Sequence, residues 1–215
     1  MPQKYSEGMQ PEVTFQIAKA LADRPQLFAL GMAAIAAHSE AESSLSSTMM
    51  GLLGTDPAPG SAIFGVIRNN NLQEQAICEL ASAVLDSADV QKLKEALKAL
   101  KVSAEDRNQI AHCMWGIDER ITDGIVLSKT NVSAKFAGEV VRIPVLKNDN
   151  DKRDVLGRLD KLVRDSMEIW RESDFKNAID KANKAKSALM ECHIDATSKA
   201  IKRGIEMASA FRIVG

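Results

Sequence analysis

The stretch from Pro25 to Gly54 constrains the fold most, because its apolar side chains recur every three, four or seven residues. This spacing places them on one face of a helix, and a proline suits the first turn. The stripe consists of Leu27, Leu30, Ala34, Ala41, Leu45, Met49 and Leu52. The sequence therefore predicts one long helix that buries this face.

Similar patterns predict helices along most of the chain. The first begins at Pro11 and places Val13, Ile17 and Leu21 on one face. The others cover about 62–68, 72–85, 90–100, 103–121, 151–170 and 174–211. The composition also favours helices, since aromatic residues make up only 4% of the chain and aromatic side chains are enriched in strands.

One stretch, 124–146, differs in character. Two β-prone runs, Ile125–Leu127 and Val140–Val145, flank a polar middle, which predicts a small β-hairpin or an ordered loop. The expected fold is all-α, a helical bundle over about 10–170 with this hairpin as an insertion. A helical C-terminal extension follows over 174–215, and its apolar positions are thinned by alanine and lysine.

Charge and composition limit the classes of function. The formal net charge is −1, so the chain has no global basic field for long nucleic acid, and an RNA site would need a local patch. The cysteines Cys78, Cys113 and Cys192 are far apart and include no C-x-x-C pair, which predicts reduced thiols and neither a zinc site nor a disulfide framework. We expect no cofactor and no metal site.

The beginning of the sequence is polar and lacks the apolar core of a secretory signal. The longest apolar run, FALGMAAIAA, is too short to span a bilayer. We therefore expect a soluble, cytoplasmic protein that does not enter a membrane.

The stretch SAEDRNQIAHCMWGIDER, residues 103–120, gathers an unusual set of side chains. A helix through it, at about 100° per residue, has an apolar face and an opposite face with Asn108, His112 and Trp115. Arg107 lies between the two faces. Either Trp115 packs on another element and His112 is a solvated neighbour, or this face lines a cleft or an interface.

The second alternative gives each side chain a chemical use. Arg107 offers phosphate a fixed, positively charged fork, and His112 can donate or accept a proton near neutral pH. Asn108 and His112 stand on adjacent helical turns and can act on one ligand.

His38 and Glu42 are also four residues apart, on or beside the apolar stripe of the helix that begins at Pro25. A buried carboxylate needs a partner. Two alternatives follow: an internal His38–Glu42 pair that serves only packing, or a Glu42 that meets Arg107 across the bundle and holds it in place.

The core RNQIAH, with Arg107, Asn108 and His112, resembles the R-N-x-x-x-H signature of the HEPN superfamily of helical-bundle proteins. The wider context RNQIAHCMWG is similar to bacterial HEPN-like proteins with RN-x-x-x-H-G-x-W-G, although Cys113 stands where glycine is frequent. The segment SEAESSL resembles an earlier helix that carries an acidic residue in such families, and it points to Glu42.

This resemblance implies a metal-independent endoribonuclease, acting as a toxin of a toxin–antitoxin system or as a phage-defence effector. Such proteins form homodimers that bring two motifs into one cleft. The resemblance assigns acid and base roles to His112 of each subunit, phosphorane stabilisation to Arg107 and positioning to Asn108. Glu42 and His38 would support the site, and Trp115 would suit the dimer interface or base stacking.

A second hypothesis is a HEPN-like dimer without catalysis that serves as a binding or scaffold module. The acidic balance of the chain favours it, because RNA-binding proteins usually carry a basic stretch. A third hypothesis is an interaction protein whose C-terminal helix pairs with itself or with another chain, such as an antitoxin. It is compatible with the other two.

Overall fold

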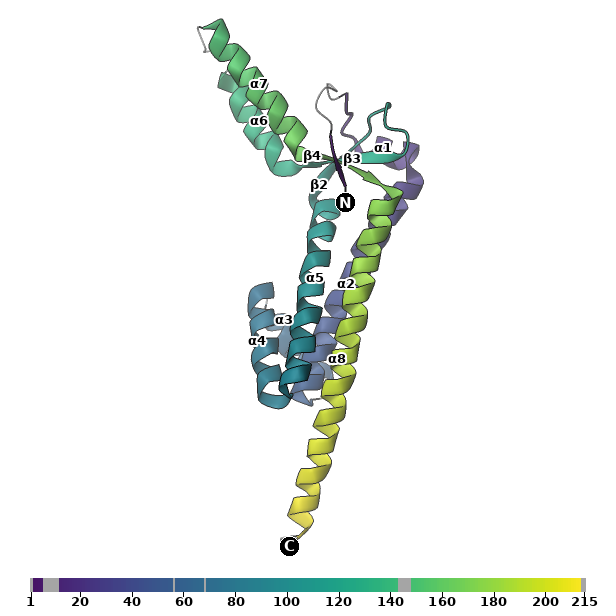
Figure 1. Ribbon diagram of the computed structural model, residues 1–215, viewed down its shortest axis with the longest axis vertical. Helices are drawn as coiled ribbons and strands as arrows, with labels where there is room; N and C mark the ends of the chain where they lie inside the picture. The colour runs from purple at the N-terminus through teal and green to yellow at the C-terminus, as the bar shows by residue number, and fades with distance from the viewer. Residues whose placement is uncertain (1, 6–11, 56, 68, 143–147, 214–215) are drawn as a thin grey trace. The chain divides into compact units, whose positions relative to one another are not determined.

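The computed structural model describes residues 2–5, 12–55, 57–67, 69–142 and 148–213. Within these ranges the chain forms eight helices and one four-stranded antiparallel sheet (Figure 1). The chain is therefore mostly helical, as predicted, and carries a small sheet. None of the described helices combines the length and the apolar character needed to cross a bilayer.

The chain divides into two compact units, each built from separate stretches. Unit 1 consists of Met1–Ile35 and Glu105–Ala178, and unit 2 of Ala36–Ala104 and Ile179–Gly215. Three long helices contribute residues to both units: α2 (Pro25–Leu53), α5 (Ser87–His112) and α8 (Glu172–Ile213).

Unit 2 is a helical bundle, to which α3 (Pro57–Val66) and α4 (Asn70–Val84) belong together with parts of α2, α5 and α8. Its apolar core joins α2, α4, α5 and α8, and it includes Ala41, Leu45, Met49, Leu52, Ile77, Leu93, Leu97 and Leu189. The long helix predicted from Pro25 is confirmed, and most of its apolar stripe is buried.

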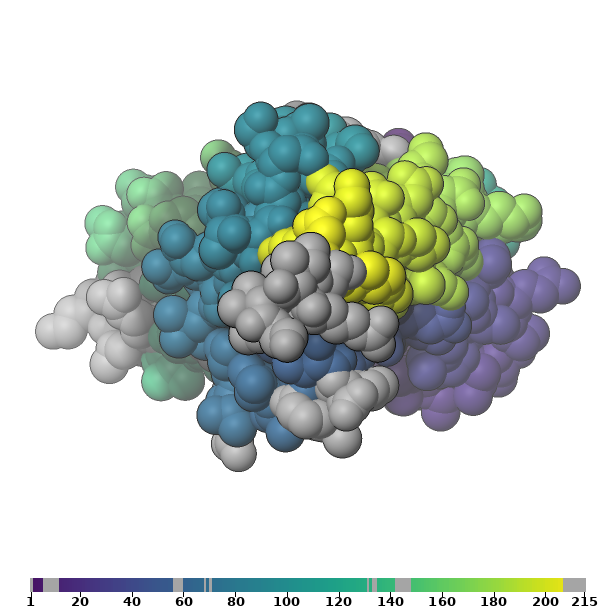
Figure 2. All heavy atoms as spheres, turned by 90° about the horizontal axis from the view of Figure 1, so that it is seen from below, coloured from purple at the N-terminus to yellow at the C-terminus, as the bar shows by residue number. Residues whose placement is uncertain are grey.

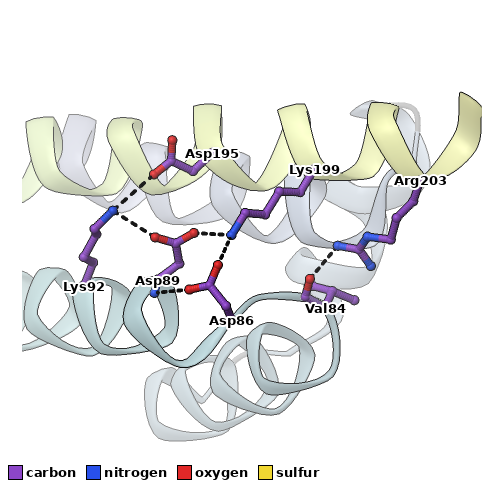
Figure 3. Close-up of polar contacts among 7 residues, drawn as sticks. All are labelled: Val84, Asp86, Asp89, Lys92, Asp195, Lys199 and Arg203. Atoms are coloured by element: carbon purple, nitrogen blue, oxygen red, sulfur yellow. Dashed lines mark hydrogen bonds and ion pairs between the residues drawn. The ribbon is translucent and has the colours of Figure 1, made fainter. Parts of the chain in front are cut away.

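Ion pairs connect α8 with the beginning of α5 within unit 2 (Figure 3). Lys199 on α8 pairs with Asp86 and Asp89, and its hydrogen bonds are the main reason why the pKa of both carboxyls lies below the usual value. One turn further along α8, Arg203 donates to the backbone oxygen of Val84 at 2.6 Å. Figure 2 shows the yellow part of α8 beside the teal part of α5.

Unit 1 holds the sheet, with strand order β1-β4-β3-β2. The strands are β1 (Gln3–Lys4), β2 (Cys113–Gly116), β3 (Gly124–Lys129) and β4 (Met167–Arg171). The register pairs Trp115 with Leu127 and Val126 with Ile169. Its helices are α1 (Ile17–Asp23) and the neighbours α6 (Thr130–Arg142) and α7 (Asp149–Ser166), which lie side by side in Figure 1.

The first helix begins later than predicted. Helix α1 starts at Ile17, while Thr14 is extended and exchanges backbone hydrogen bonds with Ile117 at 2.9 and 3.0 Å. This bridge removes Val13 from the predicted helix, because tertiary pairing outweighs local helical spacing. Pro11, the predicted starting residue, lies outside the described residues.

The two helices predicted at 90–100 and 103–121 are instead one helix, α5, which ends at His112. Ser103 does not begin a helix; its hydroxyl donates to the carbonyl oxygen of Leu100 at 2.8 Å inside α5. Since α5 contains neither glycine nor proline, nothing in its sequence interrupts it.

The predicted hairpin is wrong in its pairing. Ile125–Leu127 does form a strand, within β3, but β3 pairs with β2 and β4. Val140, Val141 and Arg142, assigned to the second strand, are helical in α6, which lies beside α7, and both valines are exposed. The rest of that predicted strand, 143–145, lies outside the described residues.

The helix predicted over 151–170 ends earlier, at Ser166, and Trp170 lies in β4. The final helix, predicted over 174–211, is confirmed as α8. Trp170 is buried, and its ring lies 5.2 Å from that of Phe175. The strand therefore contributes Trp170 to an aromatic cluster that the helical spacing alone did not reveal.

A buried polar cluster ties β1 to the connection between β2 and β3. Asp118 is 1% exposed, and Arg120 donates to its two oxygens at 2.8 and 2.5 Å. The hydroxyl of Tyr5 donates to Asp118 and accepts from Arg120 at 2.9 Å. The Arg120 hydrogen bonds hold the pKa of Asp118 well below its usual range, whereas burial and Asp118 raise the pKa of Tyr5 to about 12.

Replacing Asp118 with Asn is expected to lower the free energy of unfolding at pH 7. Because the side chain of Arg120 is 35% exposed, solvent screens part of the pair, and we expect a loss of about 1–2 kcal/mol. A depressed carboxyl pKa contributes stability above the unfolded value of about 3.9, and this stability is lost as the pH falls further. Urea unfolding at pH 7 and pH 3 measures both effects.

The neighbouring substitution Glu119→Gln is the control, since that side chain is 84% exposed and pairs only at the surface with Lys19. We expect a change below about 0.5 kcal/mol. Equal losses for the Asn variant at pH 7 and pH 3 would contradict the assigned role of the Asp118 charge.

Trp115, which follows the end of α5, belongs to an aromatic cluster in unit 1 with Phe28 and Phe175. Trp115 is 7% exposed, and its ring lies 5.3 Å from that of Phe28 and 5.9 Å from that of Phe175. A side-chain carbon at Gly31 would overlap Cη2 of Trp115 and would lie 3.0 Å from its Cζ2. Gly31 is therefore required for the close approach of α2 to the indole.

The substitution Gly31→Ala is expected to destabilise the protein by about 1–3 kcal/mol, because Trp115 has to move. Gly157→Ala on α7 is the matched control, since a side-chain carbon there meets nothing within 4 Å. Without the clash, alanine in a helix should stabilise by roughly 0.5–1 kcal/mol. Chemical unfolding should show that the two substitutions change the free energy of unfolding in opposite directions, and only Gly31→Ala should change the tryptophan fluorescence. Changes in the same direction would refute the prediction.

Candidate functional site

The motif residues lie at the C-terminal end of α5, where the helix gives way to β2. His112 is the last residue of α5, and Asn108 lies one turn before it. Both side chains are exposed. Their predicted placement on adjacent turns is confirmed, and both are accessible to a ligand.

Asn108 and His112 line one open hollow of about 630 Å³ in unit 1, which we call the α5-end hollow. Its other lining residues come from α5, β2, β3 and the beginning of α6: Glu105, Gln109, Cys113, Lys129 and Thr130. The hollow therefore brings together the two motif residues and a lysine that is distant in the sequence.

Arg107 lies beside the α5-end hollow, half-buried, and it is not among the residues that line it. Its Nη1 donates to Oδ1 of Asn108 at 2.8 Å. Within the described residues, its buried Nε has no hydrogen-bond partner. The guanidinium is thus oriented by Asn108 but not saturated with acceptors.

Two other residues that line the hollow are Gln109 and Cys113. Gln109 donates to the carboxylate of Glu168 on β4. Burial alone would raise the pKa of Glu168, but hydrogen bonds from Gln109 and Lys4 bring it below the usual value, so the group is a carboxylate. Burial raises the pKa of the Cys113 thiol. Cys113 is therefore a poor nucleophile at neutral pH.

Trp115 does not share a helical face with His112, because it lies on β2 rather than on a continued helix. Its Nε1 donates to the carbonyl oxygen of Ile110 at 2.9 Å, and the ring is buried among Phe28 and Phe175. The alternative in which Trp115 packs inside its own chain is therefore the one observed. In this structure the side chain has no exposed face on which a base can stack.

His38 and Glu42 lie on the part of α2 that belongs to unit 2. His38 is 2% exposed, and its Nε2 lies 3.4 Å from Oε1 of Glu42. The predicted internal pair is therefore present. Contact between Glu42 and Arg107 stays a prediction.

Lys129 and Glu105 were not identified from the sequence, although both line the α5-end hollow. Lys129 pairs across the sheet with Cys113, the residue that follows His112. That register depends on β2, which sequence analysis assigned to a helix. The available signal was the β-prone run that ends just before Lys129, but nothing local showed which strand it joins.

The arrangement can bind and protonate an anionic group. His112 and Lys129 offer nitrogen donors, Asn108 offers an amide, and Glu105 is the one carboxylate among the described residues that line the hollow. Across the described parts of the chain, no group of three or more His, Cys, Asp or Glu side chains is placed to hold a metal ion.

Comparison of the chain with protein-family models, with curated proteins and with solved structures finds no match.

Proposed function

We propose that this protein is a metal-independent endoribonuclease of HEPN type, acting as a toxin or a phage-defence effector. The observation that supports it best is the α5-end hollow, which Asn108 and His112 line together with Lys129. A lone histidine in a core is usually structural, whereas this one is exposed beside a second basic group. Both groups are able to meet one phosphodiester.

The proposed reaction needs one base and one acid. The base takes the proton of a ribose 2′-hydroxyl, whose oxygen attacks the adjacent phosphorus. The bond from phosphorus to the 5′-oxygen breaks, and the acid protonates that oxygen. The products are a 2′,3′-cyclic phosphate and a 5′-hydroxyl end, so no water is consumed in this step.

Two copies of the chain supply the two proton-transfer groups in this proposal, one His112 from each. Arg107 stabilises the extra negative charge of the phosphorane, and Asn108 fixes the orientation of that guanidinium.

Purified protein incubated with single-stranded RNA in EDTA tests the proposal. We expect cleavage that yields cyclic phosphate ends by mass spectrometry, and no cleavage of DNA of the same sequence, because DNA lacks the 2′-hydroxyl. His112→Ala should lower the rate at least about 100-fold, the contribution expected of a general acid or base. Lys98→Ala, an exposed change on α5 outside the hollow, is the control.

Three results would contradict the proposal. They are activity that EDTA abolishes, activity that His112→Ala retains, and a protein that is monomeric at micromolar concentration by analytical ultracentrifugation. The last matters because the mechanism needs two motifs in one cleft.

The second candidate is a non-catalytic, HEPN-like dimeric binding or scaffold protein. The net charge of −1 and the presence of Glu105 in the α5-end hollow favour it, since both weaken attraction of RNA. RNA binding or dimerisation without cleavage, unchanged by His112→Ala, would support this candidate over the first.

A further inference from the structure

Unit 2 contains a second hollow, which we call the α2–α5 cavity. Its volume is about 430 Å³, within the range of pockets that hold small molecules. Its lining comes from α2, α3, the beginning of α4 and the middle of α5. It consists of His38, Glu42, Leu45, Phe64, Asn71, Gln73, Glu74, Leu97, Leu100, Lys101 and Ala104.

A hydrogen-bond chain orients the polar wall of the cavity. The hydroxyl of Ser103 donates to the carbonyl oxygen of Leu100 at 2.8 Å, so its oxygen accepts from Nδ1 of His38 at 2.9 Å. Nε2 of His38 then faces Oε1 of Glu42 at 3.4 Å. In this tautomer Nδ1 carries the proton, so Nε2 of His38 and the Glu42 carboxylate, which is itself 42% exposed, are two neighbouring acceptors.

The packing of α2 against α5 does not by itself require a polar side chain at His38. A buried polar group costs stability unless all its hydrogen bonds are made, and an apolar side chain would fill the position of His38 at lower cost. The chain therefore places two adjacent acceptors, Nε2 of His38 and the Glu42 carboxylate, at the wall of the cavity, where a ligand that donates hydrogen bonds can bind to both.

Two further lining residues, Gln73 and Glu74, also present acceptors. The amide nitrogen of Gln73 is already used, since it donates to the carbonyl oxygens of Ile67 and Phe64 at 2.6 and 3.5 Å, which leaves its carbonyl oxygen. Among the described lining residues, Glu74 adds a second carboxylate, against one cation, Lys101. A ligand of this wall should therefore donate hydrogen bonds and carry positive charge.

The rest of the lining is apolar, with Leu45, Phe64, Leu97 and Leu100. We propose that the α2–α5 cavity binds a small primary amine, with its ammonium group at Glu42 and Glu74 and its apolar body against these side chains. All the described lining residues belong to Ala36–Ala104 of unit 2, whereas the described residues of the α5-end hollow belong to unit 1.

Hexylamine, hexanol and hexanoate share one apolar body and differ in their polar end, so they test the proposal on the full chain. Isothermal titration calorimetry gives the affinity of each compound, and a ligand of the folded state also raises the melting temperature. We expect saturable binding of hexylamine, weaker binding of hexanol and the weakest binding of hexanoate.

Glu42→Gln and Glu74→Gln should each weaken hexylamine binding about tenfold or more, since each removes a charged acceptor. Glu40→Gln is the matched control, because Glu40 is also on α2 but pairs with Lys186 at 2.6 Å outside the cavity. It should bind hexylamine like the parent. Ala104→Phe, which fills the cavity, should abolish binding of all three compounds.

Hexanoate that binds as tightly as hexylamine would overturn the proposal, because the site would then not select positive charge. No saturable binding of hexylamine would overturn it as well. Equal weakening by the Glu40 and Glu42 variants would do the same, since it would reveal a general charge effect. None of these outcomes depends on RNA cleavage, and loss of cleavage in His112→Ala says nothing about the amine.

Discussion

The hydrogen bond from the indole of Trp115 to the carbonyl oxygen of Ile110 is the contact on which the proposed nuclease site depends. The last four carbonyls of a helix lack partners within it, and Ile110 is one of these residues in α5. By satisfying this carbonyl, Trp115 draws the chain out of the helix directly after His112 and starts β2. The same change of direction pairs Cys113 with Lys129 and so brings the lysine to the α5-end hollow.

The helices of unit 2 and the sheet of unit 1 differ in how far local pattern determines them. The apolar residues from Leu27 to Leu52 recur at a spacing that only a helix places on one face, and they form that face of α2. The stretch after His112 is not determined locally. Its sequence, CMWG, is compatible with a helix by spacing, and it becomes a strand only through its pairing with β3. The position of His112 and Asn108 was therefore predictable, while Lys129, the buried state of Trp115 and the hollow itself depend on contacts between distant parts of the chain.

The net charge of the chain was the main argument from the sequence against an RNA substrate. The structure shows that the charges around the hollow matter more than the net charge. A net charge of −1 describes the whole chain, but interaction with a phosphate falls off within about 10 Å at ordinary ionic strength. In the proposed function, an RNA strand at the α5-end hollow would meet His112, Lys129 and Glu105 among the described residues. Carboxylates in unit 2, such as Asp86 and Asp89, are paired with Lys199 and contribute little beyond their own surroundings.

The three histidines of the chain show how one residue type is put to different uses. His38 is buried, with both ring nitrogens facing partners, so its proton is held in a fixed network. His193 packs against Gly51, where a side-chain carbon would come within 3.0 Å of its Nδ1. His112 is the exposed one, at a helix end beside a hollow. An imidazole that exchanges protons with a substrate has to be reachable and free to change its protonation, and among the three only His112 combines exposure with a basic neighbour in the same hollow.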